Sequence, residues 1–527
     1  MSGREISIAR KYHESTKHTV WSVQTSRHYL DWNNKPALYK NYLDLEPIPL
    51  PGDLTDTGIP AIQAVSREIV ETGKEAIPSL SQIAYLLYYS AGITKKLIYT
   101  HGEHTFRAAA SAGALYPVEI YLACCDLPGL PAGVYHFSPA DFALRTLRQG
   151  DWRAFLDRAS GGYQEVQQAP LILLFTAITW RSAWKYQARS YRYHFWDAGT
   201  ILANSLAACA AQRLPARVVM GFVDEDLNSL LGIGREEEKG LCLFPVGWTS
   251  LPAPEPPAEL APLNLRIAPL SDDPLVYQGI EKMHIASSLH NPGEVSSWRS
   301  PMQPKPEEPP QGRLFSLETL QAVKAAAKPL EEAVLQRGSS RRFLRQEISF
   351  VELSLLLETA IRNFQSDWLA PNGALMNDVY LNVHAVDGLP AGAYIFRPQD
   401  HALQLLKTGN FRSESAFLCL GQDLGGDSSA TLFFLADLEV ILERYGNRGY
   451  RLAQMEAGLL GGKLYLSAYA LGRGATGLTF YDNEVVSFFS PHAEGKEAMF
   501  VTALGAPGRS GRRDGRMIRI LPGESRE

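Results

Sequence analysis

Residues 129–150 read GLPAGVYHFSPADFALRTLRQG, and residues 388–409 read GLPAGAYIFRPQDHALQLLKTG. The two stretches are identical at 13 of 22 positions and align without a gap. Similarity of this kind within one chain marks an internal duplication, because unrelated segments do not match over such a length. The sequence therefore predicts two copies of one domain.

The duplication extends outward from this stretch in both directions. Further matched segments keep the same order in both halves: 79–87 with 349–357, 185–193 with 444–452, and 221–232 with 479–490. The first pair begins at Ser79 and Ser349, each followed by apolar residues at helical spacing, which predicts helices with serine N-caps. In the later segments Gly199 matches Gly458 and Asp224 matches Asp482.

Proline content separates the two copies. Thirteen of the 33 prolines lie between Leu251 and Gln311, a composition typical of an extended linker. We therefore expect an N-terminal arm at 1–55, a first domain at 56–250, a linker or arm at 251–311 and a second domain at 312–527. Helices alternate with apolar strands in each half, which predicts an α+β fold with a mixed sheet flanked by helices. Fused duplicates commonly replace a two-fold dimer, so we expect an intramolecular pseudo-dimer, with a higher oligomer also possible.

Composition excludes several classes of protein. The net charge of −5 and pI near 6.2 give no general attraction to nucleic acid or to an anionic membrane. The five cysteines have neither zinc-ligand spacing nor an even number, so we expect no metal site and a reducing compartment. Without an apolar signal segment at the start or a run long enough to span a bilayer, the sequence predicts a cytoplasmic protein.

The two copies differ in a basic segment. The second half carries Arg337-Gly338-Ser339-Ser340-Arg341-Arg342-Phe343 before its first matched helix, and guanidinium groups beside hydroxyls suit a phosphate or carboxylate. At the matching positions the first half keeps Arg67 but has Ile69 and Glu71, and a carboxylate there would repel an anion. The alternative interpretation of the basic segment is a solvated turn.

A turn of small residues shows the opposite difference between the copies, because the first half keeps it and the second half does not. Residues 111–117 read SAGALYP, whereas the matching residues 371–377 read PNGALMN and lose the serine, tyrosine and proline. Small residues let backbone and a hydroxyl approach a flat ligand closely. The first half has thus kept the turn and the second half the basic segment, which predicts one complete site per chain. After the last strand, Arg509, Arg512 and Arg513 add cations to the second half, and a disordered basic tail is the alternative interpretation for Arg512 and Arg513.

Together the R-G-S-S-R-R-F segment, SAGALYP, the GLPAG motif and the GAPGR ending at Arg509 resemble the FMN-dependent nitroreductase superfamily, and within it the SagB-type dehydrogenases. The resemblance implies a nitroreductase-like fold and about one FMN per chain, bound between the two halves. It implies a phosphate site formed by Arg337, Ser339, Arg341 and Arg509. It also implies that the turn at Ser111, Ala112, Gly113, Ala114, Leu115 and Pro117 approaches the flavin, and that the backbone at Gly477 and Leu478 faces its ring.

The same resemblance points to a catalytic pair. SagB-type enzymes that oxidise azolines carry a Lys-Tyr pair, which Lys185 and Tyr186 match, whereas the second half has Arg444 beside Tyr445. A lysine can act as a base when its pKa is lowered, which arginine cannot do. The alternative is an ordinary surface and packing pair.

We therefore expect hydride transfer between FMN and an azoline-like substrate, either a small molecule or a modified peptide. The alternatives are an NAD(P)H-dependent nitro or quinone reductase, and a non-catalytic flavin- or peptide-binding scaffold.

Overall fold

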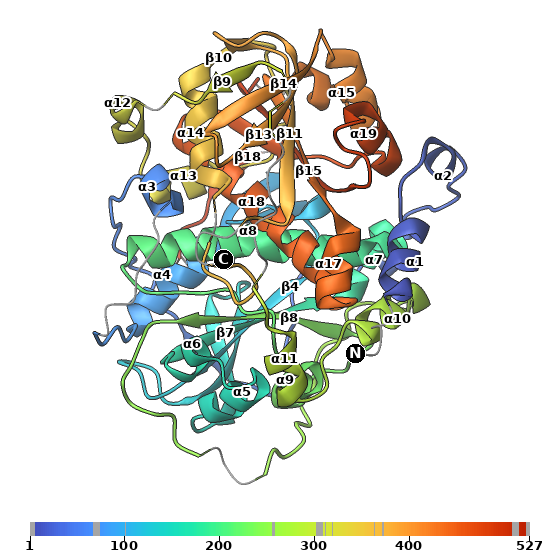
Figure 1. Cartoon of the computed structure of the whole chain (residues 1–527). Coiled ribbons are helices and arrows are strands. Elements are labelled where there is room, and N and C mark those ends of the chain that lie inside the picture. The colour runs from blue at the N-terminus through green and yellow to red at the C-terminus, as the bar shows by residue number, and fades with distance from the viewer. Residues whose placement is uncertain are drawn as a thin grey trace.

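The computed structural model describes residues 6–66, 74–100, 102–255, 259–301, 309–310, 312–318, 320–362, 364–370, 374–508 and 516–522. Each copy of the repeat builds one large sheet with helices against it, and the two copies stack on either side of a central helix pair (Figure 1). The expected α+β fold with two fused domains is confirmed.

The two large sheets share one plan. The first has the order β1 (Pro47–Pro49), β6 (Ala143–Gln149), β5 (Gly133–Ser138), β4 (Val118–Cys124), β7 (Leu171–Ile178), β8 (Glu238–Val246). The second has the order β16 (Gly474–Gly477), β17 (Glu497–Gly505), β15 (Ala430–Ala436), β11 (Asn377–Val383), β13 (Gly392–Arg397), β14 (Ala402–Thr408), β9 (Leu314–Ser316). Neighbouring strands in both are antiparallel, and the repeated GLPAG motif leads into the hairpins β5–β6 and β13–β14. Parallel pairing joins β10 (Ile348–Ser349) and β12 (Val386–Asp387) in a separate two-stranded sheet, so the described strands of each large sheet are antiparallel rather than mixed.

The helices also follow the repeat. Those of the first half are α3 (Ala61–Ser66), α4 (Leu80–Ala91), α5 (Arg153–Ala159), α6 (Gln164–Gln167), α7 (Thr179–Tyr186), α8 (Ser190–Ala211) and α9 (Asp224–Leu231). Those of the second half are α12 (Gln321–Ala325), α13 (Leu330–Gln336), α14 (Phe350–Ala360), α15 (Arg412–Leu418), α16 (Asp423–Asp427), α17 (Leu438–Tyr445), α18 (Arg448–Ala470) and α19 (Asp482–Phe489).

The predicted serine caps are confirmed. Ser79 accepts a hydrogen bond from the Gln82 backbone and Ser349 accepts one from Glu352, and each partner's side chain returns a bond to the cap. Such a reciprocal box satisfies amide groups that the helix itself leaves free. The caps therefore set the starts of α4 and α14 from local sequence alone.

Helices α8 and α18 cross at the centre of the molecule, with one sheet beyond each (Figure 1). They meet at the matched glycines: a Cβ atom at Gly199 would lie 2.6 Å from the carbonyl carbon of Gly458, and one at Gly458 would lie 2.5 Å from Cα of Trp196. Side chains at these positions would force the helices apart. The two glycines therefore set how closely the halves pack.

Buried ion pairs lock the crossing in both directions. Asp482 of the second half binds two arginines of the first half, and Asp224 of the first half binds two of the second. The arginines are Arg189 and Arg192 for Asp482, and Arg448 and Arg451 for Asp224. Because all six groups are buried, each pair needs its partner to offset the loss of hydration.

At the edge of the interface, two short helices also make contacts from one copy to the other. α1 (Ser7–Ser15) places His13 Nδ1 3.3 Å from the Tyr450 hydroxyl of α18, and α10 (Gln278–Ala286) places His284 Nδ1 3.2 Å from the Tyr191 hydroxyl of α8. Each copy thus sends an N-terminal helix onto the other copy's central helix. α10 lies inside the segment expected to be a linker, beside α11 (Pro292–Trp298). The remaining arm helix is α2 (Val20–Gln24).

The end of the described chain crosses back to the first half. β18 (Arg516–Arg519) pairs with β2 (Ile93–Tyr99), which pairs with β3 (Gly102–Arg107) in a separate three-stranded sheet. This sheet forms one wall of the cleft between the halves. In the described residues no helix combines the length and apolar character needed to cross a bilayer.

Candidate functional site

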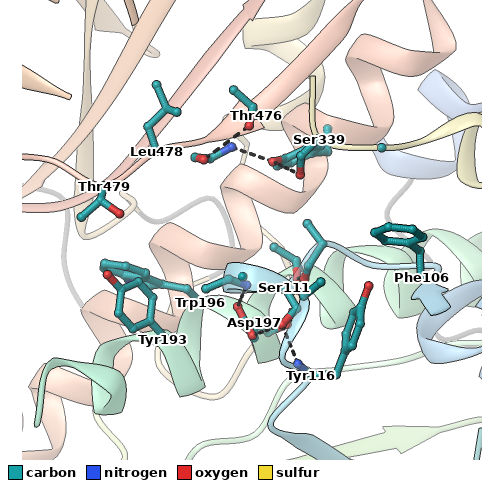
Figure 2. Close-up of a pocket in the computed structure, with 18 of the residues that line it drawn as sticks. Phe106, Ser111, Tyr116, Tyr193, Trp196, Asp197, Ser339, Thr476, Leu478 and Thr479 are labelled. Atoms are coloured by element: carbon teal, nitrogen blue, oxygen red, sulfur yellow. Dashed lines mark hydrogen bonds between the residues drawn. The ribbon is translucent and has the colours of Figure 1, made fainter. Parts of the chain in front are cut away.

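A pocket of about 410 Å³ lies between the two halves, and most of the predicted site residues line it. Figure 2 shows its walls facing each other: Ser111, Tyr116, Trp196 and Asp197 come from the first half, and Ser339, Thr476, Leu478 and Thr479 from the second. The predicted residues that the structure brings together here are Ser111, Ala112, Gly113, Ala114, Lys185, Tyr186, Arg337, Ser339, Arg341, Gly477 and Leu478.

Some predicted residues lie elsewhere. Leu115 packs with Trp180, Ala183 and Trp184 in a small apolar cluster, and Pro117 lines a separate narrow cavity behind the turn. Both hold the turn from behind and do not line the pocket. Arg509 lies outside the described residues, as does the Arg67–Glu71 segment in which Ile69 and Glu71 replace the basic segment.

The SAGALYP turn forms a short 3₁₀ segment, η2 (Ala112–Ala114), with Gly113 at φ 63°. The last two residues of α7 lie directly over it: a Cβ atom at Gly113 would be 2.8 Å from the Tyr186 hydroxyl and 3.2 Å from Lys185 Nζ. The positive φ favours glycine here, and a Cβ atom would push the ends of the Tyr186 and Lys185 side chains aside. The turn and the Lys-Tyr pair are therefore one unit.

Asp197 on α8 holds the turn in place, and sequence reasoning missed it. Its carboxylate accepts hydrogen bonds from the Ser111 hydroxyl at 2.5 Å and from the Ala112 amide at 3.0 Å. Ser111 Oγ in turn accepts from the Tyr116 amide at 2.9 Å. The serine hydroxyl expected to face a ligand is thus committed to the protein. Burial raises the pKa of Asp197 to about 7, although both hydrogen bonds oppose the rise.

The basic segment of the second half is tied to both halves. The Arg337 guanidinium donates to the carbonyl oxygens of Arg107, Ala108 and Ala109, which precede the SAGALYP turn. Three of its donor contacts therefore join the halves. Ser339 Oγ lies 3.2 Å from the Tyr465 hydroxyl, which accepts from the Gly477 amide at 2.6 Å. The basic segment and the Gly477 turn thus form one connected wall.

Lys185 is half-buried in the pocket, and its surroundings disfavour the charged form of its amine. Its pKa is lowered from the ordinary lysine value, first by desolvation and then by the positive charge of Arg341 from the other half. Burial raises the pKa of Tyr186 well above the ordinary tyrosine range, so its hydroxyl stays protonated. The pocket therefore places a lysine that gives up its proton more easily than usual next to a tyrosine hydroxyl that can donate a hydrogen bond.

The matching position in the other half is filled by the chain itself. Val218 to Gly221 correspond to Thr476 to Thr479, and there Asp367 accepts hydrogen bonds from the Met220 and Gly221 amides, both at 2.9 Å. Arg299 binds Asp367 and the Gly221 carbonyl. A Cβ atom at Gly221 would meet Asp367, Arg299 and Trp298 within 3.0 Å. Side chains of this protein therefore occupy the space that the open pocket leaves to a ligand.

A signal in the sequence could have identified Asp197. Asp197 and Glu456 occupy the same register of the matched helices, and both are fully buried carboxyl groups whose pKa burial raises to about 7. Glu456 accepts from the backbone and side-chain amides of Asn377, at the end of the second copy's turn. An acidic residue kept at one position of two buried helices marks a shared role in holding a turn.

Comparison with known proteins places the chain in a family. A crystal structure of a nitroreductase-like protein from Anabaena variabilis superposes with a TM-score of 0.75 at 26% identity, covering 95% of this chain and 99% of that one. A nitroreductase-like protein of Methanocaldococcus jannaschii is 26% identical over 203 residues, which are 37% of this chain and 98% of that protein.

Two relatives are named for peptide processing. The trifolitoxin-processing protein TfxB of Rhizobium leguminosarum bv. trifolii is 30% identical over 174 residues, 32% of this chain and 47% of that protein. The microcin B17-processing protein McbC of Escherichia coli is 30% identical over 125 residues, 22% of this chain and 45% of that protein. The chain thus spans about half the length of both. The family model described as the nitroreductase family matches residues 63–248 and again residues 334–506. The chain therefore belongs to the nitroreductase family and carries its domain twice.

Proposed function

We propose that this protein is an FMN-dependent oxidoreductase of the SagB type that dehydrogenates an azoline ring in a peptide, at one site between its two halves. The pocket at the interface carries the proposal, because the turn and Lys-Tyr pair of the first half meet the basic segment of the second half there. Neither half supplies these groups alone.

The residues present fit FMN. The nitroreductase family generally binds flavin, and a pocket of about 410 Å³ lies within the range of small-molecule sites. Ser339 and Arg341 would hold the phosphate, with Arg509 as a further candidate. Arg337 would contribute mainly by fixing the wall, since three carbonyl oxygens already engage it. Gly113 and Gly477 both line the pocket, and neither places a side chain in it.

Lys185 and Tyr186 would handle the protons. Dehydrogenation of an azoline to an azole removes a proton and a hydride from adjacent ring atoms. Lys185 Nζ, with its lowered pKa, would take the proton, while the Tyr186 hydroxyl would donate a hydrogen bond to the ring. When bound, FMN supplies the two-electron acceptor for the hydride, with dioxygen as the terminal oxidant.

The peptide-processing names of TfxB and McbC support a peptide substrate. A second candidate, NAD(P)H-dependent reduction of nitro compounds or quinones, is favoured by the match to a nitroreductase-like protein along nearly the whole chain. Anaerobic addition of NADPH distinguishes the two, because only the reductase would bleach the flavin absorbance without any peptide present.

Turnover of a synthetic peptide with one thiazoline ring tests the proposal. The FMN-loaded protein should yield a product lighter by two hydrogen atoms in mass spectrometry. Lys185→Ala should keep its flavin absorbance and lose most of this turnover, whereas Arg444→Ala, at the matching position of the other copy, should not change it. A protein that takes up no FMN, or a Lys185→Ala variant with unchanged turnover, would contradict the proposal.

A further inference from the structure

Tyr193 stands out among the pocket residues that the proposed chemistry does not use. It lies in the first turn of α8, and its side chain lines the pocket although the residue is only 3% exposed. Its ring lies 4.4 Å from that of Tyr186 and 4.6 Å from that of Trp196. Figure 2 shows Tyr193 and Trp196 together at one end of the pocket, on the wall facing Thr479. The three rings form an aromatic wall beside the Lys-Tyr pair.

The Tyr193 hydroxyl is buried and has no hydrogen-bond partner among the described residues. Leaving a buried polar atom unpaired costs about 1–3 kcal/mol, and nearly all such atoms in proteins find a partner. An apolar ring of the same shape would avoid that penalty. The hydroxyl is therefore best explained by a ligand atom that completes its hydrogen bonding.

The second copy supports this interpretation. The residue that matches Tyr193 there is Leu452, which is fully buried and carries no polar group. The hydroxyl of Tyr445, which matches Tyr186, already donates to the carbonyl oxygens of Ser300 and Trp368. In the half whose pocket is filled by the protein's own side chains, the two matching positions, Leu452 and Tyr445, therefore leave no hydroxyl unpaired. The unpaired hydroxyl is kept in the half with the open pocket.

We propose that Tyr193 is a substrate-binding residue whose hydroxyl hydrogen-bonds a polar atom of the azoline ring or of the adjoining peptide group. Its ring is tilted by 38° from that of Tyr186 and by 87° from that of Trp196, and together the three rings form the apolar wall against which a planar heterocycle packs. This inference rests on the proposed function for the identity of the substrate. Because a site built around a hydrogen bond rejects ligands that lack it, Tyr193 would also select for heterocycles with an accessible acceptor.

Tyr193→Phe, which removes only the hydroxyl, tests the inference in the FMN-loaded protein with the thiazoline peptide. We expect KM to rise about tenfold with kcat changed much less, since the lost bond contributes to binding. The melting temperature without ligand should stay equal or rise, because an unpaired buried hydroxyl is removed. Tyr394→Phe is the matched control: its hydroxyl donates to the Pro390 carbonyl at 2.6 Å in the sheet of the second half. It should lower the melting temperature and leave KM unchanged.

Equal KM values in wild type and Tyr193→Phe would overturn the inference. Weaker FMN binding in the variant would also overturn it, since the hydroxyl would then face the cofactor. If wild type leaves the peptide unoxidised, the proposed function fails, and titration with the thiazole peptide, followed by flavin absorbance, still tests Tyr193. Equal dissociation constants there would reject its role, and about tenfold weaker binding by Tyr193→Phe would support it.

Discussion

Gly113 shows how a single residue joins the parts of this site. Its φ of 63° strains any side chain, and a Cβ atom would lie only 2.8 Å from the Tyr186 hydroxyl and 3.2 Å from Lys185 Nζ. Gly113→Ala should therefore displace Tyr186 and Lys185 and lower kcat/KM for the thiazoline peptide about tenfold to a hundredfold, since small misplacements of reacting groups have effects of this size. Steady-state kinetics of the FMN-loaded variant measure this.

Gly472 provides the matched control, because it has φ 69° and a Cβ atom added to it would meet nothing within 4 Å. Both alanine variants should lose about 1–2 kcal/mol of unfolding free energy from the left-handed backbone alone. Only Gly113→Ala should change the kinetics. Equal kinetic effects in the two variants would show that the contact with Tyr186 does not matter.

The carboxyl group of Asp197 makes stability depend on pH. Its folded-state pKa of about 7 lies above the ordinary value of 3.8, so the unfolded chain ionises first as the pH rises. The contribution to stability is thus complete below about pH 4 and lost by about pH 7. Asp197→Asn, whose side-chain oxygen can still accept from the Ala112 amide and whose Nδ2 can donate to Ser111 Oγ, should remove this loss, which amounts to about 4 kcal/mol at most. Urea unfolding of both proteins across this range gives the difference.

Glu456→Gln separates the effect of a buried carboxyl group on stability from its effect on FMN binding. Its pKa is raised to about 7 by burial in the same way, so the variant should show a similar pH effect on unfolding. None of the described residues 374–377 of the turn that it holds lines the open pocket, and FMN affinity should stay at the wild-type value. Asp197→Asn should by contrast bind FMN with an altered pH dependence. Identical flavin titrations of both variants at every pH would contradict a role for Asp197 in positioning the turn.

At the scale of elements, the ion pairs across α8 and α18 carry the contact between the halves. Asp482→Asn leaves Arg189 and Arg192 buried without a countercharge, and such a loss destabilises by about 3–5 kcal/mol. Asp224→Asn should have a similar effect through Arg448 and Arg451. Denaturant unfolding measures both.

Asp427→Asn is the control for the ion pairs, because its partner Arg345 is largely exposed. Exposed pairs contribute about 0–1 kcal/mol, so this variant should unfold close to wild type. Losses below about 1 kcal/mol for the buried variants would mean that the arginines find other partners or water.

Elements were predictable where local sequence determines them. The capped helices at Ser79 and Ser349 follow from residues within one turn, and the repeat itself revealed the two domains. The pairing of Asp224 with Arg448 was not predictable, although both residues lie in matched segments, because a repeat shows which positions correspond and not which copy each contacts. The same limit applied to Asp197, whose partners lie 85 and 86 residues away. Contacts across the pseudo-two-fold axis required the structure.

At the scale of the whole molecule, the two interfacial positions have diverged into an open pocket and a filled one. In the open pocket the turn near Leu478 faces a cavity, whereas at the matching turn Asp367 engages the Met220 and Gly221 amides. A buried carboxylate with two amide donors and an arginine is well satisfied, so displacing it with a ligand would be unfavourable. Asp367→Ala should therefore destabilise the protein without adding a second flavin.

Transplanting the residues of the first copy into the basic segment of the second tests whether one pocket accounts for all binding. The double variant Ser339→Ile with Arg341→Glu should abolish FMN binding in the entire chain, because the introduced carboxylate would repel the phosphate and the introduced isoleucine offers no hydroxyl donor. Wild type should hold about one FMN per chain, measured as flavin absorbance against protein concentration. If the position filled by Asp367 could also bind, wild type would hold two and the double variant would keep one. If the double variant holds no flavin and its circular dichroism equals that of wild type, all the FMN in wild type binds in the interface pocket.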